Sequence, residues 1–221
     1  MSDISVIQQL LKPHGLVVLA ELADRLLVGN AGSAFWSCFE RSPEFEDGQP
    51  HPLDRWSERI GRAVAAELNA RVVFPFRGPP YLPVLKWAAE SGQAFPSPIS
   101  MFIHREYGLW HAYRFALVFP EPLSGLSPAP ATESPCLSCP GQPCLDACPV
   151  SAFSEGRYRV GDCVNFLTAN ESSDCRKAGC EARAACPVAT AYQYRPRHAK
   201  FHMDAFLKSQ NSPVNQSVSE R

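Results

Sequence analysis

Residues 136–149 read CLSCPGQPCLDACP, a run in which four cysteines and three prolines follow one another closely. The chain has nine cysteines, and all except Cys38 lie in a single region. The eight cysteines of this region are Cys136, Cys139, Cys144, Cys148, Cys163, Cys175, Cys180 and Cys186. The fourth and the eighth are each followed by a proline. Grouped thiolates that end in a Cys-Pro pair are typical ligands of iron–sulfur clusters.

The spacing of the first four cysteines can be compared with a known pattern. Bacterial two-cluster ferredoxins use C-x-x-C-x-x-C-x-x-x-C-P, and the fourth cysteine of that run ligates the other cluster. This chain has four residues instead of two between Cys139 and Cys144, and a four-residue gap occurs in plant-type spacing. The sequence therefore predicts two 4Fe-4S clusters in the C-terminal third.

Eight grouped cysteines have three other possible uses. Four disulfides would suit a small secreted scaffold, whereas a reducing compartment keeps thiols free. Two structural zinc ions prefer separated C-x-x-C pairs, and only Cys136 and Cys139 have that spacing. One cluster with spare thiols is the third alternative. Cys38, between Trp36 and Phe39, is expected to be a buried apolar thiol.

Composition narrows the class of protein. The chain has 221 residues, of which 45% are hydrophobic and 19% charged, with a net charge of −1. Such a balance predicts a globular protein without a general attraction to nucleic acid or to anionic membranes. The start of the sequence lacks the features of a signal peptide, and no apolar stretch approaches the length of a membrane span. We expect a cytoplasmic protein with no membrane association; nucleic acid as a partner is disfavoured.

The first half of the chain alternates predicted helices and strands up to Phe119. Helices are predicted at residues 3–11, 34–40, 53–69 and 82–90, and strands at 16–22, 25–29 and 71–76. Residues 99–104 and 110–119 are predicted to form a β-hairpin. This order predicts an α+β fold with an α/β domain at residues 1–125.

The second half has a different composition. Residues 120–135 are rich in proline, serine and alanine and are interpreted as a linker. An iron–sulfur domain is expected at residues 126–208, and a polar, disordered tail at residues 209–221. The stretch YQYRPRHAKFHM, residues 192–203, is interpreted as an amphipathic helix that closes over the cysteine region. The alternative is a basic surface for RNA or a partner protein.

Several motifs also resemble known families. Residues 83–92 (PVLKWAAESG), 99–120 (ISMFIHREYGLWHAYRFALVFP), 144–149 (CLDACP) and 162–170 (DCVNFLTAN) resemble epoxyqueuosine reductase and related corrinoid reductases, including reductive dehalogenases. The first 125 residues resemble the CblC-type cobalamin-processing domain. There the pattern H-x-x-x-G-x-W-x-A-x-R is matched by His104, Gly108, Trp110, Ala112 and Arg114.

The resemblance implies a fold, ligands and a cofactor. The fold would be a nitroreductase-like (CblC- or epoxyqueuosine reductase-like) domain followed by a small ferredoxin-like domain with two 4Fe-4S clusters. One cluster would be held by Cys136, Cys139, Cys144 and Cys186, and the other by Cys148, Cys163, Cys175 and Cys180. The second cluster would lie nearer a corrinoid such as cobalamin. His104, Trp110 and Arg114 would contact that cofactor, and a flavodoxin, a ferredoxin or a reductase would donate the electrons.

Arg114 is notable from the residues alone, because it lies inside the apolar strand WHAYRFALVF. A buried guanidinium must contact an anionic ligand or a structural partner, and both options are open. The contacting group would be a propionamide or the lower-ligand phosphate of a corrinoid, or a carboxylate of a thiol such as glutathione.

The chain also departs from epoxyqueuosine reductase. That family has an acidic proton donor before the PVL helix, whereas residues 76–80 here read FRGPP. The family's G-W-x-G-K-N motif is likewise absent. Reduction of a tRNA epoxide is therefore disfavoured, and no catalytic residue is assigned. The sequence favours an oxidoreductase that passes electrons to cobalamin or to a small substrate. A stand-alone ferredoxin-type electron carrier is the alternative.

Overall fold

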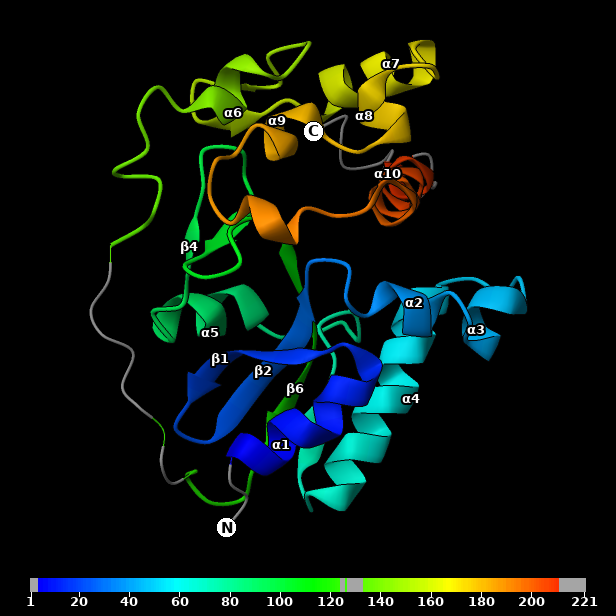
Figure 1. The fold of residues 1–221 in the computed structure, drawn as a ribbon, viewed down its shortest axis with the longest axis vertical. Coiled ribbons are helices and arrows are strands. Elements are labelled where there is room, and N and C mark those ends of the chain that lie inside the picture. Colours follow the sequence, from blue (N-terminus) through cyan, green and yellow to red (C-terminus); the bar gives the residue numbers. More distant parts are fainter. Residues whose placement is uncertain (1–3, 124–125, 127–132, 211–221) are drawn as a thin grey trace.

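A computed structural model of the chain describes residues 4–123, 126 and 133–210 (Figure 1). Its centre is a four-stranded antiparallel sheet in the order β1-β2-β6-β3. The strands are β1 (Val17–Leu22), β2 (Arg25–Ala31), β6 (His111–Val118) and β3 (Arg71–Val73). The strands predicted at residues 16–22 and 25–29 are confirmed, and they pair as neighbours with Leu22 facing Arg25.

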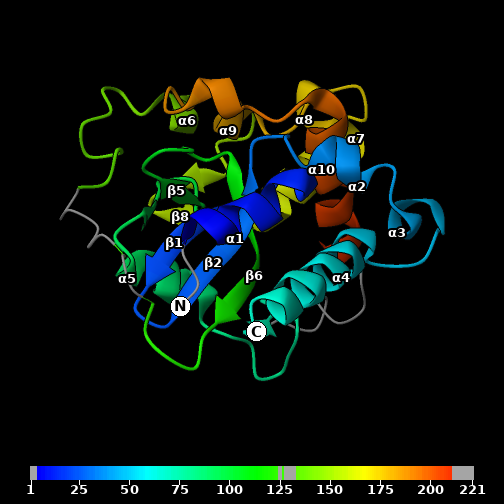
Figure 2. The same cartoon turned by 60° about the horizontal axis from the view of Figure 1, so that its bottom comes forward.

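The two faces of this sheet are covered by different helices. Helices α1 (Ile4–Leu11) and α4 (Pro52–Glu67) lie together on one face (Figure 2), and α5 (Val84–Glu90) packs on the other. Alternate residues of β2 and β6 point to the two faces, so Val28 and Phe115 join one core while Leu27 and Ala116 join the other.

Helix α4 confirms the longest predicted helix. Its residues Trp56, Ile60 and Val64 are at most 3% exposed. The spacing of four residues places them on one face, which packs against the sheet. Two short helices, α2 (Trp36–Phe39) and α3 (Pro43–Glu46), close the same core.

The predicted hairpin of residues 99–104 and 110–119 is wrong. Strand β5 (Phe102–His104) pairs with β4 (Ala94–Pro96) in a separate two-stranded sheet. Strand β6 pairs with β2 on one edge and β3 on the other, so neither edge is free for β5. The tight turn that suggested a hairpin is real, but only a single bridge, between His104 and Gly108, links its two sides.

The cysteine-bearing region forms a second layer above the sheet in Figure 1. Its elements are short: α6 (Pro143–Asp146), β7 (Phe153–Ser154), β8 (Arg157–Tyr158), α7 (Val160–Ala169), α8 (Asp174–Lys177) and α9 (Glu181–Ala184). Two single-turn 3-10 helices, Lys12–His14 and Thr190–Tyr192, complete the structure. Together these elements confirm the mixed α+β class.

The last helix, α10 (Pro196–Gln210), matches the helix predicted for residues 192–203 from Pro196 onward, but it begins four residues later and continues to Gln210. It packs against α8, and its His198 ring stacks on Trp36 with 5.0 Å between ring centroids. The helix therefore contacts both layers. Ser209 and Gln210 belong to it, which corrects the start of the predicted tail, and residues 211–221 lie outside the described part. The predicted linker lies partly outside it too, although Leu123 and Leu126 pack on the main core.

Candidate functional site

The eight grouped cysteines are free thiols, as is Cys38. They fall into two sets of four that influence one another electrostatically. We call Cys136, Cys139, Cys144 and Cys186 the first group, and Cys148, Cys163, Cys175 and Cys180 the second group. Cys38 lies apart from both, against the main core, and its thiol donates to the Pro13 carbonyl over 3.3 Å.

Mutual proximity defines the first group. Burial raises the pKa of the Cys144 thiol, and the charges of Cys186, Cys136 and Cys139 raise it further. Burial likewise raises the pKa of Cys136, with Cys186 and Cys139 adding to the effect. The pKa of Cys186 rises through burial and, to a lesser degree, through Cys139. Each of these electrostatic partners belongs to the first group.

The second group is coupled in the same way. Burial raises the pKa of the Cys180 thiol, and Cys163 and Cys148 raise it further. Burial raises the pKa of Cys175 to about 12, with a further contribution from Cys180. The four side chains also line one small cavity, together with the apolar residues Val150, Phe153, Phe166, Leu167, Ala182 and Met203. They therefore lie around a common space.

Two short helices explain why the groups cross over in sequence. Helix α6 carries Cys144 of the first group in its first turn and is followed by Cys148 of the second. Helix α9 is capped by Cys180 of the second group and followed by Cys186 of the first. The two helices pack against each other. A single turn advances about 5.4 Å, which separates the thiols at its two ends.

Hydrogen bonds to sulfur occur in the second group. The Ala152 N–H donates to the Cys148 Sγ over 3.3 Å. The hydroxyl of Tyr158 bonds to the Cys163 thiol, and that bond partly offsets the rise that burial causes in the pKa of Cys163. Hydrogen bonds to ligating sulfur are one of the levers that set cluster potentials.

Within the described residues, no three His, Cys, Asp or Glu side chains converge on a position for a single metal ion. A cubane cluster distributes its four thiolates over four iron atoms, so its ligands do not meet at one point. The grouping of the cysteines is therefore the geometry that matters for a cluster.

A larger cleft lies between the two layers. It consists of two adjoining cavities of about 520 and 610 Å³, which share Ser100, Met101, Arg183, Tyr194 and His202. We call the cavity of about 520 Å³ the inner cavity and the cavity of about 610 Å³ the sheet-side cavity. The inner cavity reaches Cys163 and Cys180 of the second group. The sheet-side cavity extends over β6 and α5. Both volumes fall in the range of small-molecule sites.

The charged side chains that line this cleft are positive. No Asp or Glu is among the described residues that line either cavity, whereas Arg183 lines both. The Arg183 guanidinium donates through Nε to the Leu109 carbonyl over 3.0 Å, and a second donation comes from Nη2. It also lies over the rings of Trp110 and Tyr194, at 4.8 and 4.2 Å from their centroids. The cleft therefore favours neutral or anionic ligands.

The structure places the three predicted cofactor contacts differently. Trp110 lines the inner cavity. Arg114 lines neither cavity: its guanidinium is buried and donates twice to Asn30 Oδ1, over 3.1 and 3.0 Å. Asn30 in turn donates to the Tyr194 hydroxyl over 3.1 Å. Arg114 therefore lies behind the wall of the cleft and is linked to it through Asn30.

The His104 side chain is held in place by backbone groups on both ring nitrogens. Its Nε2 lies 2.8 Å from the Leu19 carbonyl, and its Nδ1 accepts the N–H groups of Glu106 and Tyr107. The carbonyl can only accept, so Nε2 carries the proton. Both ring nitrogens are used by the backbone, and the side chain lines neither cavity.

Several residues of the cleft were missed from the sequence. Arg183 belongs to α9 and His202 to α10, and Tyr194 precedes α10. The aromatic and basic composition of residues 192–203 was the available signal for Tyr194 and His202. The approach of these residues to Trp110 depends on how α9 and α10 dock across the two layers, which spacing along the chain does not reveal.

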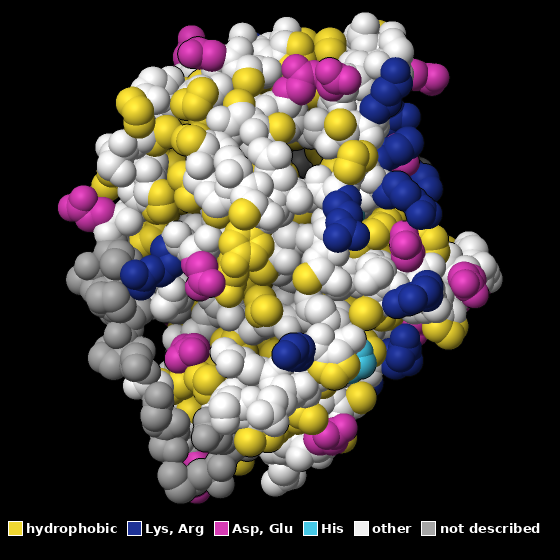
Figure 3. Space-filling view, in the orientation of Figure 1, with side chains coloured by type: hydrophobic (Ala, Val, Ile, Leu, Met, Phe, Trp, Pro, Cys, Tyr) yellow, Lys and Arg dark blue, Asp and Glu magenta, His cyan; other side chains and the backbone are white. Residues whose placement is uncertain are grey.

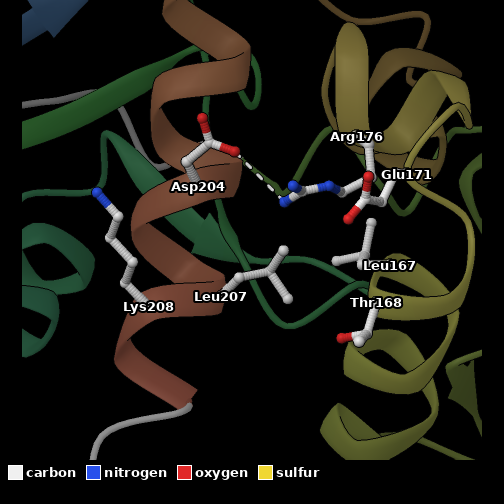
Figure 4. Close-up of a pocket in the computed structure, with 7 residues that line it drawn as sticks. All are labelled: Leu167, Thr168, Glu171, Arg176, Asp204, Leu207 and Lys208. Atoms are coloured by element: carbon white, nitrogen blue, oxygen red, sulfur yellow. Dashed lines mark hydrogen bonds and ion pairs between the residues drawn. The ribbon is translucent and has the colours of Figure 1, made fainter.

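A third hollow, of about 300 Å³, lies between α7 and α10 (Figure 4). Arg176 and Asp204 face each other across it, with Nη1 and Oδ1 3.3 Å apart, while Lys208 points away. Because Arg176 and Asp204 pair with each other, these two charges link α8 to α10 and are not free for a ligand.

Comparison with known proteins adds no identification. No family model matches the chain, and no curated protein matches it. No helix in the described residues is both long and apolar enough to span a bilayer.

Proposed function

We propose that this chain is an iron–sulfur oxidoreductase that holds one 4Fe-4S cluster in each cysteine group and passes electrons to a ligand in the cleft. The observation that carries the proposal is the sorting of eight thiols into two sets of four, each electrostatically coupled within itself. Four thiolates are the usual ligand set of such a cluster.

The chemistry of the thiols supports this assignment. Burial raises the pKa of Cys175, Cys180 and Cys186, so these groups are neutral thiols in the metal-free protein at neutral pH. Cluster binding would release their protons and replace them with bonds to iron, which couples binding to pH and to folding. The apolar lining of the small cavity fits a cofactor that must be kept from water.

The positions of the groups suggest the direction of electron flow. Cys163 and Cys180 of the second group border the inner cavity, whereas no cysteine of the first group is among its described lining residues. A cluster in the second group would therefore be the immediate electron donor to the ligand. A cluster in the first group would receive electrons from the outside.

Cobalamin is the ligand favoured by the resemblance to corrinoid reductases and CblC-type domains. When bound, it would supply a cobalt centre that becomes nucleophilic on reduction. Trp110, Tyr194 and Met101 provide flat or apolar walls, and Arg183 suits a polar or anionic substituent. A thiol substrate with carboxylates would also match Arg183. The epoxyqueuosine reductase-like activity stays disfavoured, because no acid lines the described cleft.

The electron donor would be a flavodoxin, a ferredoxin or a reductase. Figure 3 shows Lys and Arg side chains gathered along one edge of the molecule, on the side of α8 and α10. Lys177, Arg195, Arg197 and Lys200 of this region are exposed. Such an edge suits an acidic partner, whose approach would be steered by charge and weakened by salt.

The decisive experiment is anaerobic purification followed by iron, sulfide and corrinoid assays on one sample. About eight iron and eight sulfide per chain are expected when both groups are loaded. Zinc in stoichiometric amount without acid-labile sulfide would refute the proposal. Iron and sulfide without any binding of added cobalamin would favour the stand-alone electron carrier.

A pair of variants tests which thiols share a cluster. Cys186→Ala should damage the cluster of the first group, and Cys148→Ala that of the second, as read from their EPR signals after reduction. If Cys148→Ala and Cys136→Ala abolish the same signal, the crossed grouping is wrong. Iron content measured on the same samples separates loss of one cluster from loss of both.

A further inference from the structure

A chain of hydrogen bonds leads from the protein surface into the cleft, and the electron path does not use it. The half-buried Ser33 Oγ lies 2.9 Å from Nδ1 of His198, a residue with no exposed surface. His198 Nε2 lies 2.9 Å from His202 Nε2. The His202 side chain lines both cavities. The chain therefore ends where a ligand would bind.

The positions of the protons follow from the donors and acceptors. The N–H of Arg195 donates to Ser33 Oγ over 2.9 Å. A hydroxyl has a second lone pair, so this bond alone does not fix its proton; among the described residues, His198 Nδ1 is the acceptor that lets the Ser33 hydroxyl donate as well, and we assign the proton there. His198 consequently carries its proton on Nε2 and donates it to Nε2 of His202.

One nitrogen of His202 is left for the ligand. A neutral His202 that accepts at Nε2 carries its proton on Nδ1. Among the described residues, no hydrogen bond to that Nδ1 is formed. It is therefore the ring atom available to a molecule in the cleft.

The surroundings keep the imidazole neutral. Burial lowers the pKa of His202 far below its ordinary value, and Arg114, His198 and Arg183 lower it further. Burial likewise lowers the pKa of His198 to about 3, with Arg114 and Arg183 contributing. No carboxylate among the described lining residues opposes this effect. A neutral imidazole in a positive field is a hydrogen-bond donor that does not compete with the ligand as a base.

Building on the electron-transfer function proposed above, we propose that His202 presents a neutral Nδ1–H donor to the ligand that is reduced in the cleft. Ser33 and His198 are positioning residues that fix this tautomer. The ligand that fits is neutral or anionic and has an acceptor atom whose electron density rises on reduction: an oxygen, a nitrogen or the cobalt of a corrinoid. A preorganised donor aimed at such an atom stabilises the charge where it develops.

The tautomer can be observed directly. In the full chain labelled with ¹⁵N-histidine, measured in the oxidised state, long-range ¹H–¹⁵N couplings should show His202 protonated at Nδ1 and His198 at Nε2. A His202 ring protonated at Nε2 would overturn the proposal, because the lone pair would then face the cleft.

Two substitutions at one position sharpen this measurement. His198→Leu removes the donor and should move His202 toward the Nε2-protonated tautomer, whereas the His198→Gln side chain can still donate an N–H and should retain the Nδ1 form. An unchanged His202 tautomer in a folded His198→Leu protein would contradict the positioning role. If His198→Leu does not fold, Ser33→Ala replaces it, since it removes the hydroxyl that orients the His198 ring.

A second readout uses aquacobalamin as the probe ligand and dithionite as the reductant. His202→Leu should slow cobalamin reduction by about 100-fold or more, the usual effect of losing one preorganised donor. His202→Gln keeps an N–H and should recover most of the rate. The cluster EPR signals should be unchanged in both variants.

The outcomes separate the two proposals. If both variants reduce aquacobalamin at the wild-type rate, His202 is not the donor, whatever the clusters do. If wild-type protein with intact clusters neither binds nor reduces aquacobalamin, the cobalamin part of the proposed function fails. In that case the NMR result alone supports or overturns the His202 assignment.

Discussion

The sheet layer and the cysteine layer are held together by different means. The sheet layer buries large side chains, among them Trp56, Phe35, Phe39 and Phe115, each at most 1% exposed. In the cysteine layer, α6, α8 and α9 have four residues each, and α6 buries none of them. The interior of the cysteine layer mixes thiols with apolar side chains such as Phe153 and Leu167.

The two layers therefore need different interactions to keep their helices folded. Isolated helices shorter than about 12 residues are marginal in water, so single-turn helices need other restraints. The sheet layer gains those restraints from buried apolar area. The cysteine layer combines apolar residues with thiols, and bonds from these thiols to a cluster would restrain its single-turn helices strongly.

Removal of the clusters should unfold one layer and leave the other. Chelation under reducing conditions should abolish amide-exchange protection in α6–α9, because metal binding and folding of such segments are coupled by several kcal/mol. Protection of the paired strands β2 and β6 should persist. Equal loss of protection in both layers would show that the sheet layer has no independent stability.

The reverse perturbation is Trp56→Ala in the centre of the sheet-layer core. The side chain is 1% exposed and contacts Phe35 and Phe39 at centroid distances of 5.7 and 5.8 Å. The cavity should lower the free energy of unfolding by about 3–5 kcal/mol, measured by urea titration of the cluster-loaded protein. Trp87→Ala, at a less buried position of α5, is the matched control and should cost clearly less. Equal losses for the two would contradict the assigned core.

Arg114→Ala tests the link between the layers. The substitution leaves Asn30 Oδ1 without its two donated hydrogen bonds, which should lower the free energy of unfolding by about 1–3 kcal/mol. Because Asn30 holds the Tyr194 hydroxyl, binding of added cobalamin should weaken while iron and sulfide contents stay the same. Loss of the clusters in this variant would show that Arg114 supports the cysteine layer directly.

Acid should loosen the contact between α10 and the sheet layer. His198 is buried against Trp36, and burial together with Arg114 and Arg183 lowers its pKa to about 3. In the unfolded chain the pKa of a histidine is about 6.5, so unfolded His198 takes up a proton at a higher pH than folded His198 does. The stability that depends on neutral His198 is therefore complete above pH 6.5 and declines as the pH falls toward 3. Melting temperatures across this range should show that decline, and His198→Gln should flatten it.

Sequence and structure agree best where one physical signal dominates. The period of Trp56, Ile60 and Val64 predicted α4 because one apolar stripe must face the core. The hairpin prediction at residues 99–119 failed because turn chemistry is local, whereas strand partners are chosen by the whole sheet. The edges of β6 were already occupied by β2 and β3.

In the candidate site, too, local sequence signals were readable, whereas contacts set by the whole fold were not. The eight cysteines could be singled out from spacing, and the structure brings them into the two sets that the resemblance implied; whether these sets bind clusters stays a prediction. Arg114 was recognised as a buried charge, but its partner Asn30 lies on the neighbouring strand, 84 positions away in sequence. His202 and Arg183 could not be assigned, because their roles arise from the docking of α10 and α9 near Trp110.

The smallest effect is expected at the ninth cysteine. Cys38 is partly buried against the main core, and its thiol makes one hydrogen bond, to the Pro13 carbonyl at 3.3 Å. Cys38→Ala removes one sulfur and a weak donor, so the free energy of unfolding should fall by about 1 kcal/mol or less. Iron, sulfide and both EPR signals should equal those of the wild type. The result is informative because Cys38 is the one thiol assigned to the sheet layer by packing alone. If its removal lowers the iron content, a ligand has been placed in the wrong layer, and the separation of the cluster ligands from the sheet layer is wrong.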